Sequence, residues 1–161
     1  MLSAEKNRNG PCGPILEIYM KTSSRNSFQG TITAIILGGL NDEVELTLAS
    51  GEKIYGQLAH ASAERLGLAV GGDALALVKA TEILLVNDND DWDVCCRNQF
   101  TGKVIKLVRG FVNGEVVLQT PSGLELNATV SLEGINRLRV ERGAPVTAVF
   151  KSSNVMIAAK K

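Results

Sequence analysis

Hydrophobic and polar residues alternate along short segments of this chain, the period-two pattern of strands with one buried face. Residues 28–37 are rich in β-branched and apolar side chains, and residues 43–48 alternate charged with apolar ones. Both segments are predicted to be strands, and three more are predicted over 53–59, 74–79 and 83–86.

Turn and helix signals separate these strands. A short helix is predicted to begin at Ser62, a good N-cap residue, and to end near Gly67. A turn is predicted at Asn41-Asp42, and Asn113-Gly114 is a strong two-residue hairpin signal. Five short strands and a one-turn helix are typical of a small, partly open barrel resembling the OB fold.

The whole pattern occurs twice. Residues 23–86 align on 95–158 without a gap. The recurring residues include Arg25, Asn26, Glu43 and Lys79, which return as Arg97, Asn98, Glu115 and Lys151.

We therefore predict an all-β protein with short helices, made of two tandem OB-like modules that pack together or exchange strands. The predicted divisions are an N-terminal extension (1–21), a first repeat (22–87), a polar linker (88–94) and a second repeat (95–161).

Composition narrows the possible functions. Lys plus Arg and Asp plus Glu number 17 each, so the chain lacks the net positive charge that drives binding to nucleic acids. Its apolar runs are far shorter than the roughly 20 residues of a membrane span, and the N-terminus has no apolar signal segment. We expect a cytoplasmic protein whose three cysteines (Cys12, Cys95 and Cys96) are reduced thiols and not zinc ligands.

Three segments carry a resemblance to a known family. Residues 22–30, with Ser23-Ser24-Arg25-Asn26 followed by Phe28 and Gly30, resemble the Ser-Ala-Arg-Asn-x-Phe-x-Gly opening of the Mop (molbindin, TOBE-type) family. Residues 62–71 resemble its central helix and turn, and residues 76–80 resemble its closing strand. The tandem arrangement is similar to the di-Mop proteins and to the molybdate-binding half of ModE-type regulators.

The resemblance implies that molybdate or tungstate is bound between modules. One chain is expected to supply the Ser-x-Arg-Asn segment, and another the helix start and the Lys strand. By position, the implied oxyanion-binding residues are Ser23, Arg25, Asn26, Ser62, Lys79 and the Ala80 backbone, with Arg97, Asn98, Ser131, Lys151 and Ser152 in the second repeat.

The chemistry of these residues agrees with that expectation. A tetrahedral dianion needs hydrogen-bond donors, and arginine offers a fixed fork while lysine offers a point charge. A helix start adds N–H groups and a favourable dipole. Because no base–nucleophile pair is visible, we predict a binding protein and not an enzyme, with no cofactor and no metal ion ligated directly by side chains.

The chain also departs from the family pattern. Ala59 stands where the family usually has threonine, and the adjacent His60 is expected to be exposed. In the second repeat, Cys95 and Cys96 replace the two serines and Gly134 replaces Ser62. The second repeat is therefore expected either to bind more weakly or to serve structure.

A structural alternative remains open for the charged residues. Arg25 and Arg97 can instead form ion pairs with the recurring Glu43 and Glu115, and the two lysines can be exposed strand-edge charges.

Three functions and two assemblies are considered. The first function is storage and homeostasis of molybdate or tungstate, and the second is a ligand-sensing module of a regulator or transporter. The third, an OB-type nucleic-acid binder, is disfavoured by charge, and no helix-turn-helix segment supports direct DNA binding. We expect a homotrimer, with a dimer as the runner-up, in which apolar strand faces at 83–86 and 155–157 are buried between subunits.

Overall fold

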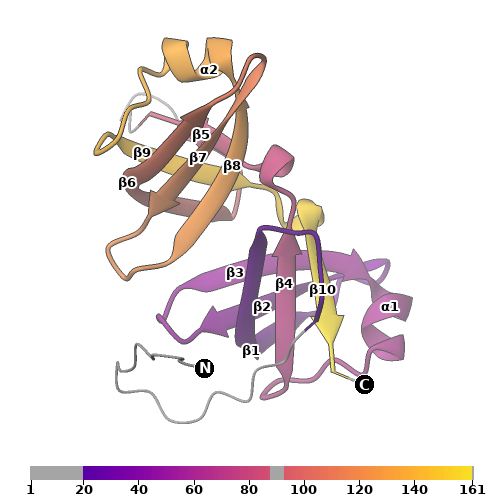
Figure 1. Cartoon of the computed structure of the whole chain (residues 1–161). Helices are drawn as coiled ribbons and strands as arrows, with labels where there is room; N and C mark the ends of the chain where they lie inside the picture. The colour runs from indigo at the N-terminus through magenta and orange to yellow at the C-terminus, as the bar shows by residue number, and fades with distance from the viewer. Residues whose placement is uncertain (1–19, 88–92, 161) are drawn as a thin grey trace, which may run out of the picture.

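The computed structural model describes residues 20–87 and 93–160 of the chain. These residues form two lobes, each built on a curled sheet (Figure 1). Most of the predicted extension (1–21) and of the predicted linker (88–94) lies outside the described residues. Within the described ranges, no helix has the length and apolar character needed to span a membrane.

The elements follow the order of the two repeats. The first repeat contains β1 (Asn26–Ile36), β2 (Asn41–Leu48), β3 (Lys53–Ala59), α1 (His60–Arg65), β4 (Asp73–Val78), the 3-10 turn η1 (Ala80–Glu82) and β5 (Leu84–Val86). The second contains β6 (Asn98–Arg109), β7 (Asn113–Gln119), β8 (Glu125–Ser131), α2 (Leu132–Arg137), β9 (Pro145–Phe150), the 3-10 turn η2 (Ser152–Asn154) and β10 (Val155–Ala159).

The two repeats exchange their last strands. The first lobe is the sheet β10-β4-β1-β2-β3 with α1, and the second lobe is the sheet β5-β9-β6-β7-β8 with α2. Met156 of β10 lies opposite Leu77, and Leu84 of β5 lies opposite Val149, so the two exchanges are equivalent under the repeat. The predicted fold class is confirmed, and of the two predicted arrangements the chain adopts strand exchange.

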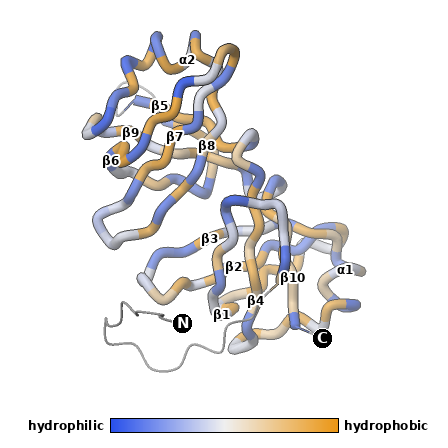
Figure 2. The backbone as a smooth tube through the Cα atoms, in the orientation of Figure 1, coloured by the Kyte–Doolittle hydropathy of each residue, from blue (hydrophilic) through white to orange (hydrophobic). Residues whose placement is uncertain are grey.

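Burial explains the strand pattern. Buried positions alternate with exposed ones along β1 and with partly exposed ones along β2, because only one face of each strand meets the core. The central strand β4 is instead buried from Ala74 to Val78 and is hydrophobic along most of its length (Figure 2). Gly30 is required for close packing, because a Cβ there would lie 2.8 Å from the Thr47 carbonyl oxygen.

The predicted hairpin at Asn113-Gly114 is wrong, because both residues lie inside β7 and the chain turns over residues 110–112. Gly114 is needed for packing, since a Cβ there would approach Ile135 Cδ1 to 2.5 Å. The predicted turn at Asn41-Asp42 likewise falls inside β2.

The apolar faces expected to be buried between subunits are largely buried within the chain. Ile83, Leu85 and Val155 are 2, 7 and 3% exposed, because the exchanged strands complete the opposite lobes. Leu84 and Met156 remain exposed on the outer faces of these strands.

Candidate functional site

Both repeats bring their predicted arginine and lysine to the same end of a sheet. Arg25 immediately precedes β1 and Lys79 immediately follows β4, and the neighbouring Asn26 and Val78 are paired in the ladder. At this sheet end the chain passes to the opposite lobe through residues 79–83, the first crossover. The second crossover, residues 151–154, passes back, and η1 and η2 lie together between the lobes (Figure 1).

The second repeat has the same arrangement. Asn98 pairs with Phe150, which places Arg97 and Lys151 at the corresponding end of the second sheet. The predicted cations of both repeats therefore gather at the junction of the lobes.

Each arginine forms an ion pair with a glutamate of the other repeat. Arg25 Nη1 lies 2.5 Å from Glu115 Oε1, and Arg97 Nη1 pairs with Glu43 Oε1. Both arginine side chains remain about half exposed, at 52 and 49%. The ion pairs considered as an alternative are thus present, and they cross from lobe to lobe.

The two arginines differ in what lies beneath them. The Arg97 guanidinium lies over the Tyr55 ring, 3.9 Å from its centroid, a cation–π contact. The residue equivalent to Tyr55 in the second repeat is Asn127, whose side chain donates weakly to the Arg25 carbonyl oxygen at 3.4 Å. Arg97 is therefore held by two interactions of its side chain and Arg25 by one.

The two predicted asparagines form reciprocal clamps between the lobes. Asn26 Oδ1 accepts a hydrogen bond from Asn127 N at 2.8 Å, and its Nδ2 donates to the carbonyl oxygens of Asn127 and Val78. Asn98 does the same with the N–H and carbonyl groups of Tyr55, both at 2.8 Å. Both asparagines are fully buried, so their carboxamides hold the arginine-bearing segments in place and do not face solvent.

The two lysines open the crossovers. Lys79 and Lys151 are exposed and precede η1 and η2, whose first residues are Ala80 and Ser152. A hydrogen bond of 2.9 Å from Asn154 to Glu82 links the two crossovers.

The predicted serines are less uniform. Ser23 is exposed, whereas the Ser24 hydroxyl lies within 3.0 Å of the carbonyl oxygens of Asn26 and Val78. Ser62 is not an N-cap, because α1 already begins at His60 with Ala59 in the cap position and no side-chain cap bond. Ser131 does cap α2, since its Oγ accepts from Gly134 N at 3.1 Å.

The exchange changes which segments face each other. A groove of about 340 Å³ runs between the first crossover with β5 and the start of α2 with the end of β8. Its polar lining includes Thr81 of the first repeat and Thr129, Ser131 and Arg137 of the second. The helix start of the second repeat therefore adjoins the segment that follows the Lys strand of the first repeat.

Sequence reasoning missed two parts of this arrangement. It did not find the backbone of Tyr55 and Asn127 as the clamp partners, and it did not find Thr81. The exact recurrence of Asn26 and Asn98 was a usable signal, since a buried amide at both positions needs a partner.

The start of α1 carries a polar pair of its own. His60 Nδ1 lies 2.8 Å from Asp42 Oδ2, and Gly38 N donates to Asp42 Oδ1 at 3.2 Å. Asp42 is only 1% exposed, whereas the His60 side chain is 39% exposed. The hydrogen bond to Asp42 raises the pKa of His60 above its ordinary value of 6.5.

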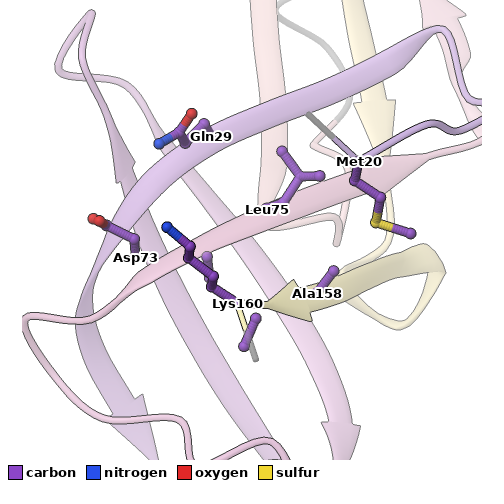
Figure 3. A pocket seen from close by; sticks show the side chains of 8 residues that line it. Met20, Gln29, Asp73, Leu75, Ala158 and Lys160 are labelled. Atoms are coloured by element: carbon purple, nitrogen blue, oxygen red, sulfur yellow. The ribbon is translucent and has the colours of Figure 1, made fainter. Parts of the chain in front are cut away.

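Other features lie apart from this junction. A hollow of about 50 Å³ lies at the edge of the first sheet, where Met20, Leu75 and Ala158 form apolar walls and Lys160 stands at the rim (Figure 3). It contains none of the predicted site residues. Cys95 and Cys96 are free thiols, and Cys12 lies outside the described residues.

Comparison with known proteins agrees with the tandem organisation. The TOBE domain matches residues 22–85 and 96–157. The molybdenum transport protein ModE of Herbaspirillum seropedicae is 37% identical over 92% of this chain. The chain spans about half, 55%, of the length of that relative.

Two further proteins are similar in complementary ways. A crystal structure of the cytoplasmic molybdate-binding protein ModG with molybdate bound superposes with a TM-score of 0.84 at 38% identity, covering 88% of this chain and all of that one. Molybdenum-pterin-binding protein 1 of Clostridium pasteurianum is 42% identical over 41% of this chain, which is 97% of its own length. That relative therefore corresponds to one repeat.

Proposed function

Because the chain belongs to the TOBE domain family, in two tandem copies, we propose that it binds molybdate or tungstate in the cytoplasm for storage and homeostasis. The observation that supports this most is the similarity to the molybdate-bound ModG protein along all of that protein's length. We propose a binding protein and not an enzyme.

The proposed ligand shell uses the groups at the lobe junction. Arg25 and Lys79, with Arg97 and Lys151 at the equivalent positions, supply positive charge and donors to a tetrahedral dianion. The Ser23 hydroxyl and the Ala80 backbone complete the first set, and Ser152 takes the place of Ala80 in the second. Charge-assisted hydrogen bonds of this kind contribute about 1.5–3 kcal/mol each.

The helix starts are proposed to supply the remaining donors. Ser131 lies in the groove beside the first crossover, and Ser62 lies on α1 in the other lobe. The clamps of Asn26 and Asn98 hold the arginine segments from behind, so we assign these two asparagines a positioning role next to the ligand.

We propose that the shell is completed in a homotrimer, with a dimer as the second candidate. The cations of a single chain remain accessible to solvent, since both arginines are about half exposed and both lysines are exposed. Exposed apolar side chains at the hairpin tips offer a surface for association; these are Ile36, Leu37 and Leu40 in the first lobe and Val108, Phe111 and Val112 in the second. Light scattering coupled to size exclusion tests this, and a stable monomer that binds tightly would contradict the shared shell.

Isothermal titration with molybdate, tungstate and sulfate tests the function. We expect micromolar or tighter binding of molybdate or tungstate and clear discrimination against sulfate. Equal affinity for sulfate, or no heat with any of the three anions, would refute the proposal.

The proposed shell is tested by Arg25→Ala and Lys79→Ala. Each change should weaken binding by about 2–5 kcal/mol, the range for removing one member of a desolvated charge pair. The fold should survive, because neither side chain belongs to the core. Wild-type affinity in both variants would show that the shell lies elsewhere.

A second candidate function is a ligand-sensing module of a regulator or transporter. The similarity to ModE along about half of that protein's length favours it. Deleting the gene would separate the two roles: loss of a sensor changes transcription of molybdate-uptake genes, whereas loss of a store changes only the molybdenum content of the cell.

A further inference from the structure

Both arginines of the proposed shell are already occupied by an anionic group of the protein. Glu115 lies against Arg25, and Glu43 lies against Arg97. The two pairs are equivalent under the repeat, and each joins residues of different repeats. A contact that recurs this way at both arginines is built into the duplicated fold.

A carboxylate and a tetrahedral oxyanion make the same demand on a guanidinium. Each offers two oxygens to the fork of N–H donors, so the two compete for one face of the arginine. The ion pairs are partly open to solvent, with Glu115 44% and Glu43 22% exposed, so the carboxylate of Glu115 in particular can leave without stranding a buried charge.

The surroundings let the side chain move while its backbone stays fixed. Asn26, next to Arg25, is locked to Asn127 of the other lobe, and Asn98 locks the segment of Arg97 to Tyr55. The guanidinium can therefore exchange one anion for another without separating the lobes.

We propose that Glu115 and Glu43 are internal competitors that hold Arg25 and Arg97 until an oxyanion displaces them. This inference rests on the proposed function. The competition lowers the affinity of the site, which favours release of a stored anion. The effect is larger at Arg25, because Arg97 keeps its contact with the Tyr55 ring after its carboxylate has gone.

Titration of sodium molybdate into full-length Glu115→Gln protein tests this proposal. We expect binding about two- to fivefold tighter than wild type, the change that corresponds to loss of an exposed ion pair. Glu43→Gln should give a smaller gain. The matched control is Glu45→Gln. Glu45 lies on the same face of β2 as Glu43 and forms an ion pair with Lys53, so the substitution also removes one negative charge and one ion pair. It should leave the affinity for molybdate unchanged.

The outcomes separate this inference from the proposed function. Binding by wild type with no gain, or a loss, in Glu115→Gln overturns the competition and leaves the function standing. A gain of equal size in Glu45→Gln overturns it too, because a general charge effect would then explain the result. No binding by wild type overturns both. Thermal melting shows whether each variant is folded. If Glu115→Gln does not fold, Glu43→Gln provides the same test at the equivalent position.

Discussion

In each lobe a strand runs directly into the short helix: β3 into α1 in the first lobe and β8 into α2 in the second. These two turns, the first and the second corner, carry different side chains. In the first lobe Asp42 is buried under His60, and both residues, together with the small Ala63, line an open pocket of about 520 Å³. In the second lobe the equivalent of Asp42 is Gly114, and Ile135, in place of Ala63, is fully buried above it.

This difference shows how a duplicated fold diverges. The first corner combines a carboxylate with a small helix residue, and the second combines a glycine with a large one, so that Ile135 packs directly against Gly114. The junction of the lobes, in contrast, has the same arginine, asparagine and lysine in both repeats. The first corner holds a titratable pair and the second is apolar, while these three junction residues are identical in the two repeats.

The largest effect on stability is expected for Ile135→Ala, which gives the second corner the small residue that the first corner has at Ala63. Because Ile135 is fully buried and Gly114 cannot fill the space, we expect a loss of about 2–5 kcal/mol in the free energy of unfolding. Urea denaturation measures this loss. A change below about 1 kcal/mol would mean that the second corner relaxes into the cavity.

Asn26→Ala and Asn98→Ala test whether the junction is equivalent in the two lobes. Each change leaves a backbone N–H and a carbonyl group of the opposite lobe without their partner, so we expect a loss of about 1–3 kcal/mol in either variant. The losses in the two variants should be similar, apart from the additional bond that Asn26 donates to the Val78 carbonyl oxygen. A loss in only one of them would show that the clamps are unequal despite their matching geometry.

The helix caps offer a reciprocal exchange. Ser131→Ala removes the cap of α2 and should cost about 0.5–2 kcal/mol, whereas Ala59→Ser supplies the missing cap of α1 and should stabilise the protein by a similar or smaller amount. Thermal melting of both variants is the measurement. No gain, or a loss, in Ala59→Ser would mean that the first corner excludes the capped geometry, and no loss in Ser131→Ala would mean that the cap of α2 contributes little.

The smallest expected effect concerns pH. Asp42 raises the pKa of His60 in the folded protein, so the extra stability is fully present below the unfolded pKa of about 6.5 and is lost as pH rises through the folded value. The melting temperature of wild type should therefore fall, as the pH rises above about 6.5, relative to that of His60→Leu, which carries the residue of the second lobe. Parallel pH profiles of the two proteins would exclude His60 as the source.

Strands were predictable and their partners were not. The alternation over residues 53–59 located β3 to the residue, because a strand with one buried face leaves that pattern in its own sequence. The exchange left no such trace: β5 and β10 are equivalent segments, and either can pair with either sheet. The prediction of a hairpin at Asn113-Gly114 was wrong because the sequence does not distinguish a glycine required for packing, here against Ile135, from a glycine required for a turn.

For the proposed site, likewise, the residues could be predicted but not their partners. Recurrence located the arginine and lysine of each repeat, and it also marked Glu43 and Glu115 as their possible partners. It did not say that each arginine would meet the glutamate of the other repeat, because that follows from how the lobes pack. Ser62 failed as a cap because the chain enters α1 directly from β3, two residues earlier.

Strand exchange also bears on how such a chain arose. With this connection, a protein of a single repeat would have to give its last strand to a second copy and receive one in return. The folding of such a protein would then depend on its concentration. Joining two repeats makes the partner part of the same molecule, at an effective concentration on the order of millimolar. In the tandem chain, strand exchange is therefore intramolecular and does not require two molecules to associate.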